Sequence, residues 1–276
     1  MSGHRARLTV VGCSGSFARP DSPASCYLVE VPRPDGGTLR VLLDLGSGAL
    51  GPLQRLVEVH DLDAVLLSHL HPDHFLDLCG LYVALKYDPV HSRPEPLPVY
   101  GPTGTFERLR QAYGSDGTHL QEVFQVREWA DGCDVDLGPA TVTPVRVNHT
   151  VETYGLRLQV PAGEVPVGEV PAGGRPGRGA VLAYTGDTDS CPALRDLARD
   201  ADLLLAEASF QEGRDTVRGV HLTGLRAGQA AADAGAGRLV LTHLPVWNDP
   251  QIVLAEARTS FDGEVEVAAQ GRRYDL

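Results

Sequence analysis

The sequence predicts an α/β fold, and two observations carry that prediction. Short apolar runs typical of buried strands alternate along the chain with stretches in which apolar residues recur at helical spacing. Between these elements lie turns that contain glycine and proline, the residues that interrupt regular structure. At 276 residues the chain is long enough to bury a large core, and we expect one domain spanning residues 1–276.

The expected strands are short runs of mainly apolar residues. The first is 8–11 and the second is 64–67. The second half of the chain contains four more, at 141–147, 180–183, 201–206 and 238–242.

The expected helices lie between these strands and carry end signals. From Asp73 to Leu85 apolar residues repeat at helical spacing, and Gly114, Gly235 and Asp249 stand where glycine ends a helix or aspartate begins one. The other predicted helices are 52–59, 102–113, 192–200, 223–234 and 250–261.

The most informative stretch is His69-Leu70-His71-Pro72-Asp73-His74. It lies on a loop between a predicted strand and a predicted helix, so alternate side chains can face two points. His69 and His71 would face one metal, and Asp73 and His74 a second. A lone histidine is usually structural, but this density of ligand-type side chains predicts a metal site.

Three more ligand-type residues follow predicted strands. His149 comes after 141–147, Asp187 after 180–183, and His243 directly after 238–242. In α/β folds, chemistry collects at the ends of strands. We therefore expect these residues to complete a two-metal centre.

The order His-x-His-x-Asp-His, then His, Asp and His, resembles that of the metallo-β-lactamase superfamily over nearly the whole chain. The resemblance implies a four-layer αββα sandwich with the site at one edge of its two sheets. Such a donor set suits zinc and tolerates manganese or iron. The resemblance implies that His69, His71 and His149 hold one zinc ion, that Asp73, His74 and His243 hold the other, and that Asp187 bridges them.

A second pair of residues bears on the reaction. Glu207 closes the strand-like run 201–206, and His221 lies just before the helix that Thr223 begins. A glutamate can orient a histidine that protonates the leaving alkoxide of a phosphodiester, and a helix N-terminus can bind a phosphate oxygen. The alternatives are that His221 only caps the helix and that Glu207 is a structural partner.

At these positions the chain resembles the ribonuclease Z branch, which carries Glu and His-Ser/Thr elements there. It is most similar to a bacterial subgroup, common in actinobacteria, that includes atypical class II cyclic AMP phosphodiesterases; the shared segments are 11–16, 21–25, 67–71 and 241–243. Ribonuclease Z also inserts a long tRNA-gripping arm between its His and Asp motifs, where this chain has only the Pro/Gly-rich segment 161–179. The resemblance thus implies a homodimer that hydrolyses a small phosphodiester, 3′,5′-cyclic AMP first, with Asp73, Glu207 and His221 as catalytic residues.

Three alternative functions stay open. They are a ribonuclease Z-type tRNA 3′-end endonuclease, a thioester or lactone hydrolase, and a non-catalytic module that binds metal or a nucleotide. The presence of all seven ligands disfavours the last. The formal net charge of −12 disfavours RNA as the main partner, because long-range attraction to phosphates is missing.

The distribution of apolar residues along the chain bears on where in the cell the protein is expected. The N-terminal residues contain no long apolar segment, and the chain has no run of about 20 apolar residues, so we expect a cytoplasmic protein with no membrane partner. Five scattered cysteines without a Cys-x-x-Cys pair predict reduced, mostly buried thiols.

Several other residues are open to two interpretations. Ser14-Gly15-Ser16 either lends groups to the substrate or is a plain turn, and Trp247 and Asn248 either border a nucleobase or lie in the core. The segment 161–179 either brings Arg175 and Arg178 to a lip near the site or is a tolerant surface loop. Four histidines without supporting neighbours are expected to be surface or structural residues: His4, His60, His91 and His119.

Overall fold

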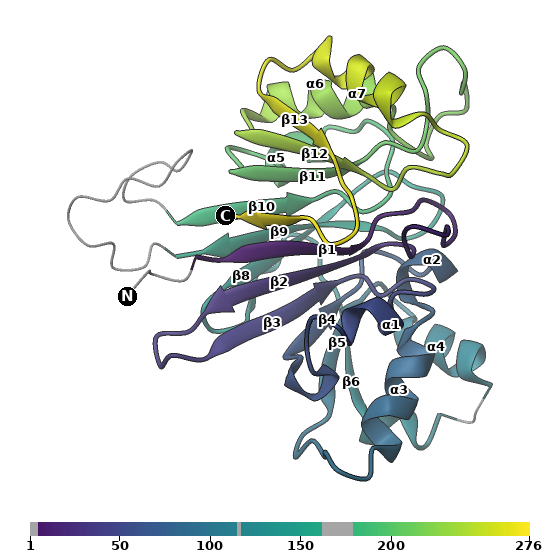
Figure 1. Cartoon of the computed structure of the whole chain (residues 1–276), viewed down its shortest axis with the longest axis vertical. Coiled ribbons are helices and arrows are strands. Elements are labelled where there is room, and N and C mark those ends of the chain that lie inside the picture. Colours follow the sequence, from purple (N-terminus) through teal and green to yellow (C-terminus); the bar gives the residue numbers. More distant parts are fainter. Residues whose placement is uncertain (1–4, 115–116, 162–178) are drawn as a thin grey trace.

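The computed structural model describes residues 5–114, 117–161 and 179–276. In these residues the strands form two seven-stranded sheets. Figure 1 shows the sheets between two groups of helices, with α1 to α4 on one side and α5 to α7 on the other. The predicted four-layer αββα sandwich is therefore confirmed.

The first sheet combines both ends of the described chain. Strands β3 to β6 run parallel to one another, while β1 and β2 are antiparallel neighbours. Its order is β14 (Arg273–Asp275), β1 (Arg7–Gly12), β2 (Cys26–Pro32), β3 (Thr38–Leu43), β4 (Ala64–Leu66), β5 (Leu97–Gly101) and β6 (Phe124–Glu128).

The second sheet comes from the second half of the chain. Strands β10 to β13 are parallel, and β9 is antiparallel to both β8 and β10, so β8 and β10 point the same way. Its order is β13 (Glu264–Val267), β12 (Arg238–Thr242), β11 (Leu203–Glu207), β10 (Ala180–Tyr184), β9 (Tyr154–Val160), β8 (Thr141–Arg146) and β7 (Val135–Asp136).

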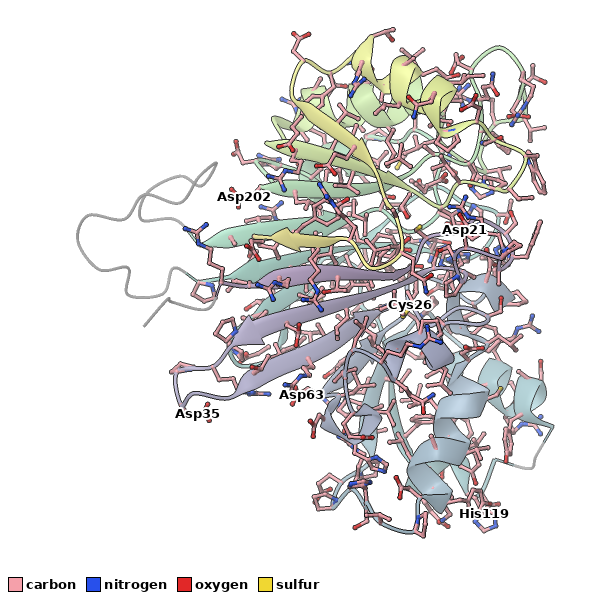
Figure 2. All side chains as sticks on the ribbon, in the orientation of Figure 1. Asp21, Cys26, Asp35, Asp63, His119 and Asp202 are labelled. Atoms are coloured by element: carbon pink, nitrogen blue, oxygen red, sulfur yellow. The ribbon has the colours of Figure 1, made fainter. Side chains whose placement is uncertain are left out.

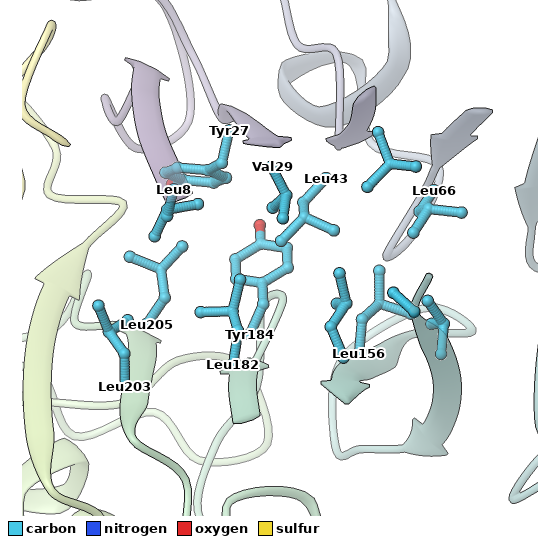
Figure 3. Packing of buried hydrophobic residues seen from close by; sticks show 14 of the residues in the cluster. Leu8, Tyr27, Val29, Leu43, Leu66, Leu156, Leu182, Tyr184, Leu203 and Leu205 are labelled. Carbon is cyan, nitrogen blue, oxygen red and sulfur yellow. The ribbon is translucent and has the colours of Figure 1, made fainter. Parts of the chain in front are cut away.

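The central core lies between the two sheets because their strands are apolar on both faces. In β2, Tyr27 and Val29 join the cluster between the sheets, whereas Cys26 and Leu28 join the cluster under the first group of helices. Figure 3 shows Tyr27 and Val29 opposite Tyr184 of the second sheet. Successive strand residues point to opposite faces, so each sheet is buried on both sides.

The helices pack onto the outer faces through apolar residues. Leu53, Leu81 and Leu109 pack on the first sheet, and Leu197 and Val253 on the second. The helices are α1 (Leu50–Leu53), α2 (Pro72–Phe75), α3 (Leu78–Tyr87), α4 (Thr105–Tyr113), α5 (Ala193–Leu197), α6 (Gly224–Ala234) and α7 (Pro250–Arg258), with 3₁₀ turns at Val59–Asp61 and Leu120–Glu122.

The end signals in the sequence act as predicted. The Thr223 hydroxyl accepts a hydrogen bond from Arg226 N at 3.3 Å, and the Asp249 carboxylate accepts one from Gln251 N at 2.8 Å. Gly114 and Gly235 end their helices with φ of 75° and 66°, a conformation that glycine adopts without steric cost.

Two helix predictions were wrong in extent. The expected helix 52–59 begins at Leu50 and ends at Leu53, because the backbone bonds beyond it tighten to three-residue spacing, with Arg55 N donating to Pro52 O and Leu56 N to Leu53 O. The helical spacing after Asp73 is divided between α2 and α3, because Asp77 N donates to Leu45 O at 3.2 Å and not to the carbonyl four residues before it. The remaining helices are shorter than expected at one or both ends.

The cysteines follow the prediction only in part. All five are free thiols, and Cys13 and Cys26 are buried, but Cys133 is exposed. Figure 2 shows Cys26 inside the molecule and Asp35 at the outer turn between β2 and β3. Among the helices described, none is long and apolar enough to cross a membrane.

The fold gathers strand ends at one edge. Strands β3 and β4 of the first sheet end there, as do β8, β10, β11 and β12 of the second, and Figure 1 places the C-terminus toward the other edge. In sequence the segment 161–179 follows β9 and precedes β10, and the described residues that flank it, Val160 and Ala180, lie at the opposite end of β10 from Asp187. Its residues 162–178, with Arg175 and Arg178, lie outside the described chain.

Candidate metal centre

The ligand-type residues all lie at this edge, where strands of both sheets end. His69 and His71 are on the loop after β4, and Asp73 and His74 are in the first turn of α2, which Pro72 begins. Three more follow strands of the second sheet: His149 after β8, Asp187 after β10 and His243 after β12.

The structure brings these seven side chains into two groups that share Asp187. Within each group one ligand atom of every residue lies within 4.8 Å of the others. The groups are His69, His71, His149 and Asp187, and Asp73, His74, His243 and Asp187.

The contact distances suit tetrahedral coordination. In the first group His71 Nδ1 lies 3.0 Å from His69 Nε2 and 3.3 Å from His149 Nε2. In the second group His243 Nε2 lies 3.1 Å from both His74 Nε2 and Asp73 Oδ2. Ligands about 2.0 to 2.1 Å from a tetrahedral ion are separated by about 3.3 Å, so each group matches the edges of such a site.

The neighbouring residues fix which histidine nitrogens face inward. The Ser68 hydroxyl donates to Asp44 Oδ2 at 2.8 Å, and therefore accepts from His69 Nδ1 at 3.1 Å. The Nδ1 group of His74 donates to the same carboxylate oxygen at 2.7 Å. Both rings thus present an Nε2 lone pair to the centre.

The other two Nε2 atoms are set in the same way. Ser209 donates its hydroxyl to His243 O at 2.6 Å and accepts from His243 Nδ1 at 2.7 Å. His149 Nδ1 donates to Val220 O at 2.7 Å. A metal ion between these inward-facing nitrogens would satisfy their lone pairs.

Electrostatics and burial support the same conclusion. Burial lowers the pKa of His69, His71 and His149, and so favours the neutral, metal-binding form of each ring. His74 differs: burial lowers its pKa, but the carboxylates of Asp187 and Asp44 outweigh burial and raise the pKa well above its usual value. These carboxylates therefore favour a positive charge at this position, which a bound metal ion would supply. Asp187 Oδ1 is buried and makes no well-aligned hydrogen bond within the described chain; it lies 3.3 Å from His74 Nε2. The residues therefore fit a divalent metal ion.

The second predicted pair, Glu207 and His221, is also assembled. Glu207 is fully buried at the end of β11, and its Oε1 lies 2.9 Å from His221 Nδ1. Burial opposes protonation of His221, but Glu207 raises its pKa to about 9. The His221 ring centroid lies 5.4 Å from that of His149 and 5.6 Å from that of His243, so this ring borders both groups.

Asp44 is a supporting residue that the sequence analysis missed. It follows β3, is fully buried, and accepts hydrogen bonds from Ser68, His74 and Tyr184. Its φ of 60° is unusual for a residue other than glycine. Its position directly after an apolar strand is the signal that could have found it.

Asp189 is a second missed residue, and it joins three loops of the site. Its backbone N donates to Asn148 O at 2.8 Å, next to His149. Its buried Oδ2 accepts from Gly219 N at 2.8 Å, two residues before His221, and pairs with Arg218 Nε at 2.9 Å.

The residues with two interpretations are also placed. Ser16 N lies 3.4 Å from His243 Nε2, so this turn touches the centre. Trp247 is 60% exposed, whereas Asn248 is buried and donates to Ser209 O.

The remaining histidines lie away from the centre. The expectation that His60 and His91 lack neighbours was wrong, because they lie together with Asp88. His119 is exposed beside Glu122 and appears near one end of the molecule in Figure 2. His4 lies outside the described residues.

Known proteins resemble this chain over most of its length. A family model described as "Beta-lactamase superfamily domain" matches residues 39–244, which include His69 and His243. Protein ML1173 of Mycobacterium leprae is 42% identical over 98% of this chain and 88% of its own length. Ribonuclease Z of Myxococcus xanthus is 31% identical over 86% of this chain and 88% of its own.

One relative also has a solved structure. The probable metallo-hydrolase YhfI of Bacillus subtilis is 31% identical over 96% of this chain and 98% of its own. Its crystal structure matches this fold with a TM-score of 0.82 at 28% identity, covering 99% of this chain and 100% of that one. The likeness thus includes the whole sandwich and the edge that carries the seven residues.

Proposed function

This chain belongs to the metallo-β-lactamase superfamily, in its ribonuclease Z-like branch, and is a metal-dependent hydrolase; from this premise we propose that it hydrolyses a small phosphodiester, with 3′,5′-cyclic AMP as the first candidate. The proposal includes one catalytic domain over residues 1–276, acting in the cytoplasm as a homodimer.

The proposed metal ligands are the seven side chains of the two groups, with two zinc ions as the preferred content. His69, His71 and His149 serve one site, Asp73, His74 and His243 the other, and Asp187 both. When bound, two such ions supply an activated water and positive charge for the phosphate oxygens.

His221 supplies the acid. Glu207 Oε1 accepts a hydrogen bond from His221 Nδ1 at 2.9 Å and favours the imidazolium form of the ring. The Nε2–H group of His221 is then the proton donor. In the proposed reaction His221 protonates the leaving 3′ oxygen, while the carboxylate of Asp73 holds or accepts the proton of the attacking water. The departing oxygen stays tethered to the product, so no grip on a distant polynucleotide is needed.

The observation that carries this proposal is the Glu207–His221 pair beside both ligand groups. An alkoxide leaving group gains more from proton donation than the thiolate of a thioester. A paired, charged histidine therefore favours a phosphodiester over a thioester.

Cleavage of precursor tRNA is the second candidate. It is favoured by the 31% identity to the protein named ribonuclease Z. The net charge of −12 favours a small substrate instead, because long-range attraction to a polyanion is weak.

The test is a substrate panel on protein loaded with Zn²⁺: 3′,5′-cyclic AMP, precursor tRNA, a thioester and a lactone. The proposal predicts 5′-AMP as the product and a rate for His221→Ala lower by about 10²- to 10⁴-fold, with His119→Ala as the matched surface control. Cleavage of tRNA alone, or of the thioester at a rate indifferent to His221→Ala, would contradict it.

A further inference from the structure

Two exposed aromatic side chains stand beside the candidate centre. Phe17 is 43% exposed and Trp247 is 60% exposed, and their ring centroids lie 5.7 Å apart with planes tilted by 45°. They come from the loop after β1 and from the loop after β12, whose first residue is His243. Segments far apart in the sequence therefore place one aromatic pair at this edge.

The pair is held close to a proposed ligand. Gly15 N donates to Leu244 O at 3.1 Å, and Ser16 N lies 3.4 Å from His243 Nε2. A Cβ on Gly15 would lie 2.3 Å from His243 O, so the two loops are in close backbone contact. The Ser14 hydroxyl donates to Phe17 O at 2.6 Å, which fixes the backbone that carries the ring.

The Trp247 side is anchored as well. The next residue, Asn248, is buried; its amide donates to Ser209 O at 2.7 Å and accepts from Arg214 at 2.7 Å. Ser209 is also the partner of His243 Nδ1. Both rings are thus attached to backbone that is bonded to the centre.

Exposed apolar side chains also gather on the other loops of the site. Exposing a large apolar group without a partner forgoes the free energy of burying it. Besides the aromatic pair, four exposed apolar residues lie within four positions of His74, His149, His221 or His243: Leu76, Val151, Val217 and Val246. Exposed aromatic rings on anchored backbone in such a setting are typical of a binding subsite.

We propose that Phe17 and Trp247 form the subsite for the nucleobase of the substrate, so the substrate class is phosphodiesters of nucleosides. The inference rests on the proposed function and deepens it. A base has a planar apolar face that stacks on aromatic rings, whereas a diester of a simple sugar or of glycerol offers none. Stacking on an aromatic side chain accounts for about 5- to 150-fold in affinity.

Trp247 provides a direct readout. The other tryptophan, Trp129, is buried and donates its Nε1–H to Leu67 O at 2.8 Å. The difference in tryptophan fluorescence between the wild type and Trp247→Phe therefore measures the emission of Trp247 alone. The experiment measures acrylamide quenching in metal-loaded protein with 5′-AMP or with ribose 5-phosphate, which keeps the phosphate and lacks the base.

The inference predicts that 5′-AMP protects Trp247 from quenching and that ribose 5-phosphate does not. Trp247→Ala and Phe17→Ala should raise KM for the cyclic nucleotide at least about fivefold, with a smaller change in kcat. Trp247→Phe should keep a KM close to that of the wild type. Val90 is exposed elsewhere on the surface, so Val90→Ala should change neither KM nor kcat.

Equal protection by both ligands, or an unchanged KM in Trp247→Ala, would overturn the subsite. So would a change of oligomeric state in Trp247→Ala with nucleotide affinity retained, since the rings would then contact a second copy of the chain. Cleavage of bis(p-nitrophenyl) phosphate is measured in parallel. If that diester is cleaved but 5′-AMP does not protect Trp247 from quenching, only the proposed subsite is contradicted. If no diester is cleaved, the proposed function is contradicted.

Discussion

Glu207 Oε1 lies 2.9 Å from His221 Nδ1, and the same carboxylate accepts hydrogen bonds from Thr188 N and Ser209 N. The glutamate is thus fixed by two loops of the site, and it in turn fixes the ring. This contact links the metal-binding edge to a proton donor, and the first prediction follows from it.

Glu207→Gln should move the alkaline limb of the pH–rate profile to lower pH. Glu207 raises the pKa of His221 to about 9, so in the wild type the acid form, and the rate, are lost as pH rises through about 9. Without this negative charge burial favours the neutral ring, and the loss begins earlier. The check is kcat against pH, with exposed Glu95→Gln as control; an unshifted limb would exclude His221 as the acid.

Asp44→Asn should weaken metal binding by about 10- to 100-fold, because outer partners of ligating histidines tune affinity by this amount. Asp44 Oδ2 accepts from His74 Nδ1 at 2.7 Å and from Ser68 Oγ at 2.8 Å. Competition with a chelator measures the change, and exposed Asp35→Asn is the control. Unchanged affinity would show that Asp44 does not orient His74.

Asp189→Asn should lower kcat by up to about 100-fold while metal content stays at the wild-type level. Asp189 accepts from Gly219 N and pairs with Arg218, and so positions the loop that carries His221. Faster hydrogen exchange at the Gly219 amide would report the loosened loop. The exposed Asp196→Asn is the control, and normal kcat with fast exchange would refute the positioning role.

Removal of metal should abolish hydrolysis and lower the melting temperature. Without a cation the inward lone pairs and the buried Asp187 carboxylate lose their partner. A ligand at 100 times its Kd stabilises by about 2.7 kcal/mol, so the melting temperature should rise with added Zn²⁺. His243→Ala should show a smaller rise; metal-free protein that is equally stable and active would contradict the assignment.

The local features of the fold could be predicted from the sequence. Thr223, Asp249 and Gly235 act within a few residues of their own position, so their effects are visible in the chain itself. The end of the helix predicted at 52–59 could not be placed, because residues 54–57, where the chain leaves the helix, contain no glycine, asparagine or proline.

In the candidate site, too, some residues could be predicted from the sequence and others could not. Its seven ligand-type residues follow apolar strands, and their order along the chain carried the family resemblance. Asp44, Ser209 and Asp189 were not found, because each acts through a partner far away in the sequence: 30 residues separate Asp44 from His74, and 34 separate Ser209 from His243. Such contacts exist only once neighbouring strands have paired, β3 with β4 for Asp44 and His74, and β11 with β12 for Ser209 and His243.

The most direct test of the central claim is the turnover of 3′,5′-cyclic AMP by protein loaded with Zn²⁺, wild type and His221→Ala side by side, with metal content measured in both. The account predicts 5′-AMP from the wild type and a rate about 10²- to 10⁴-fold lower from a variant that retains its metal. Intact cyclic AMP, in a preparation that cleaves precursor tRNA at its 3′ end, would contradict it.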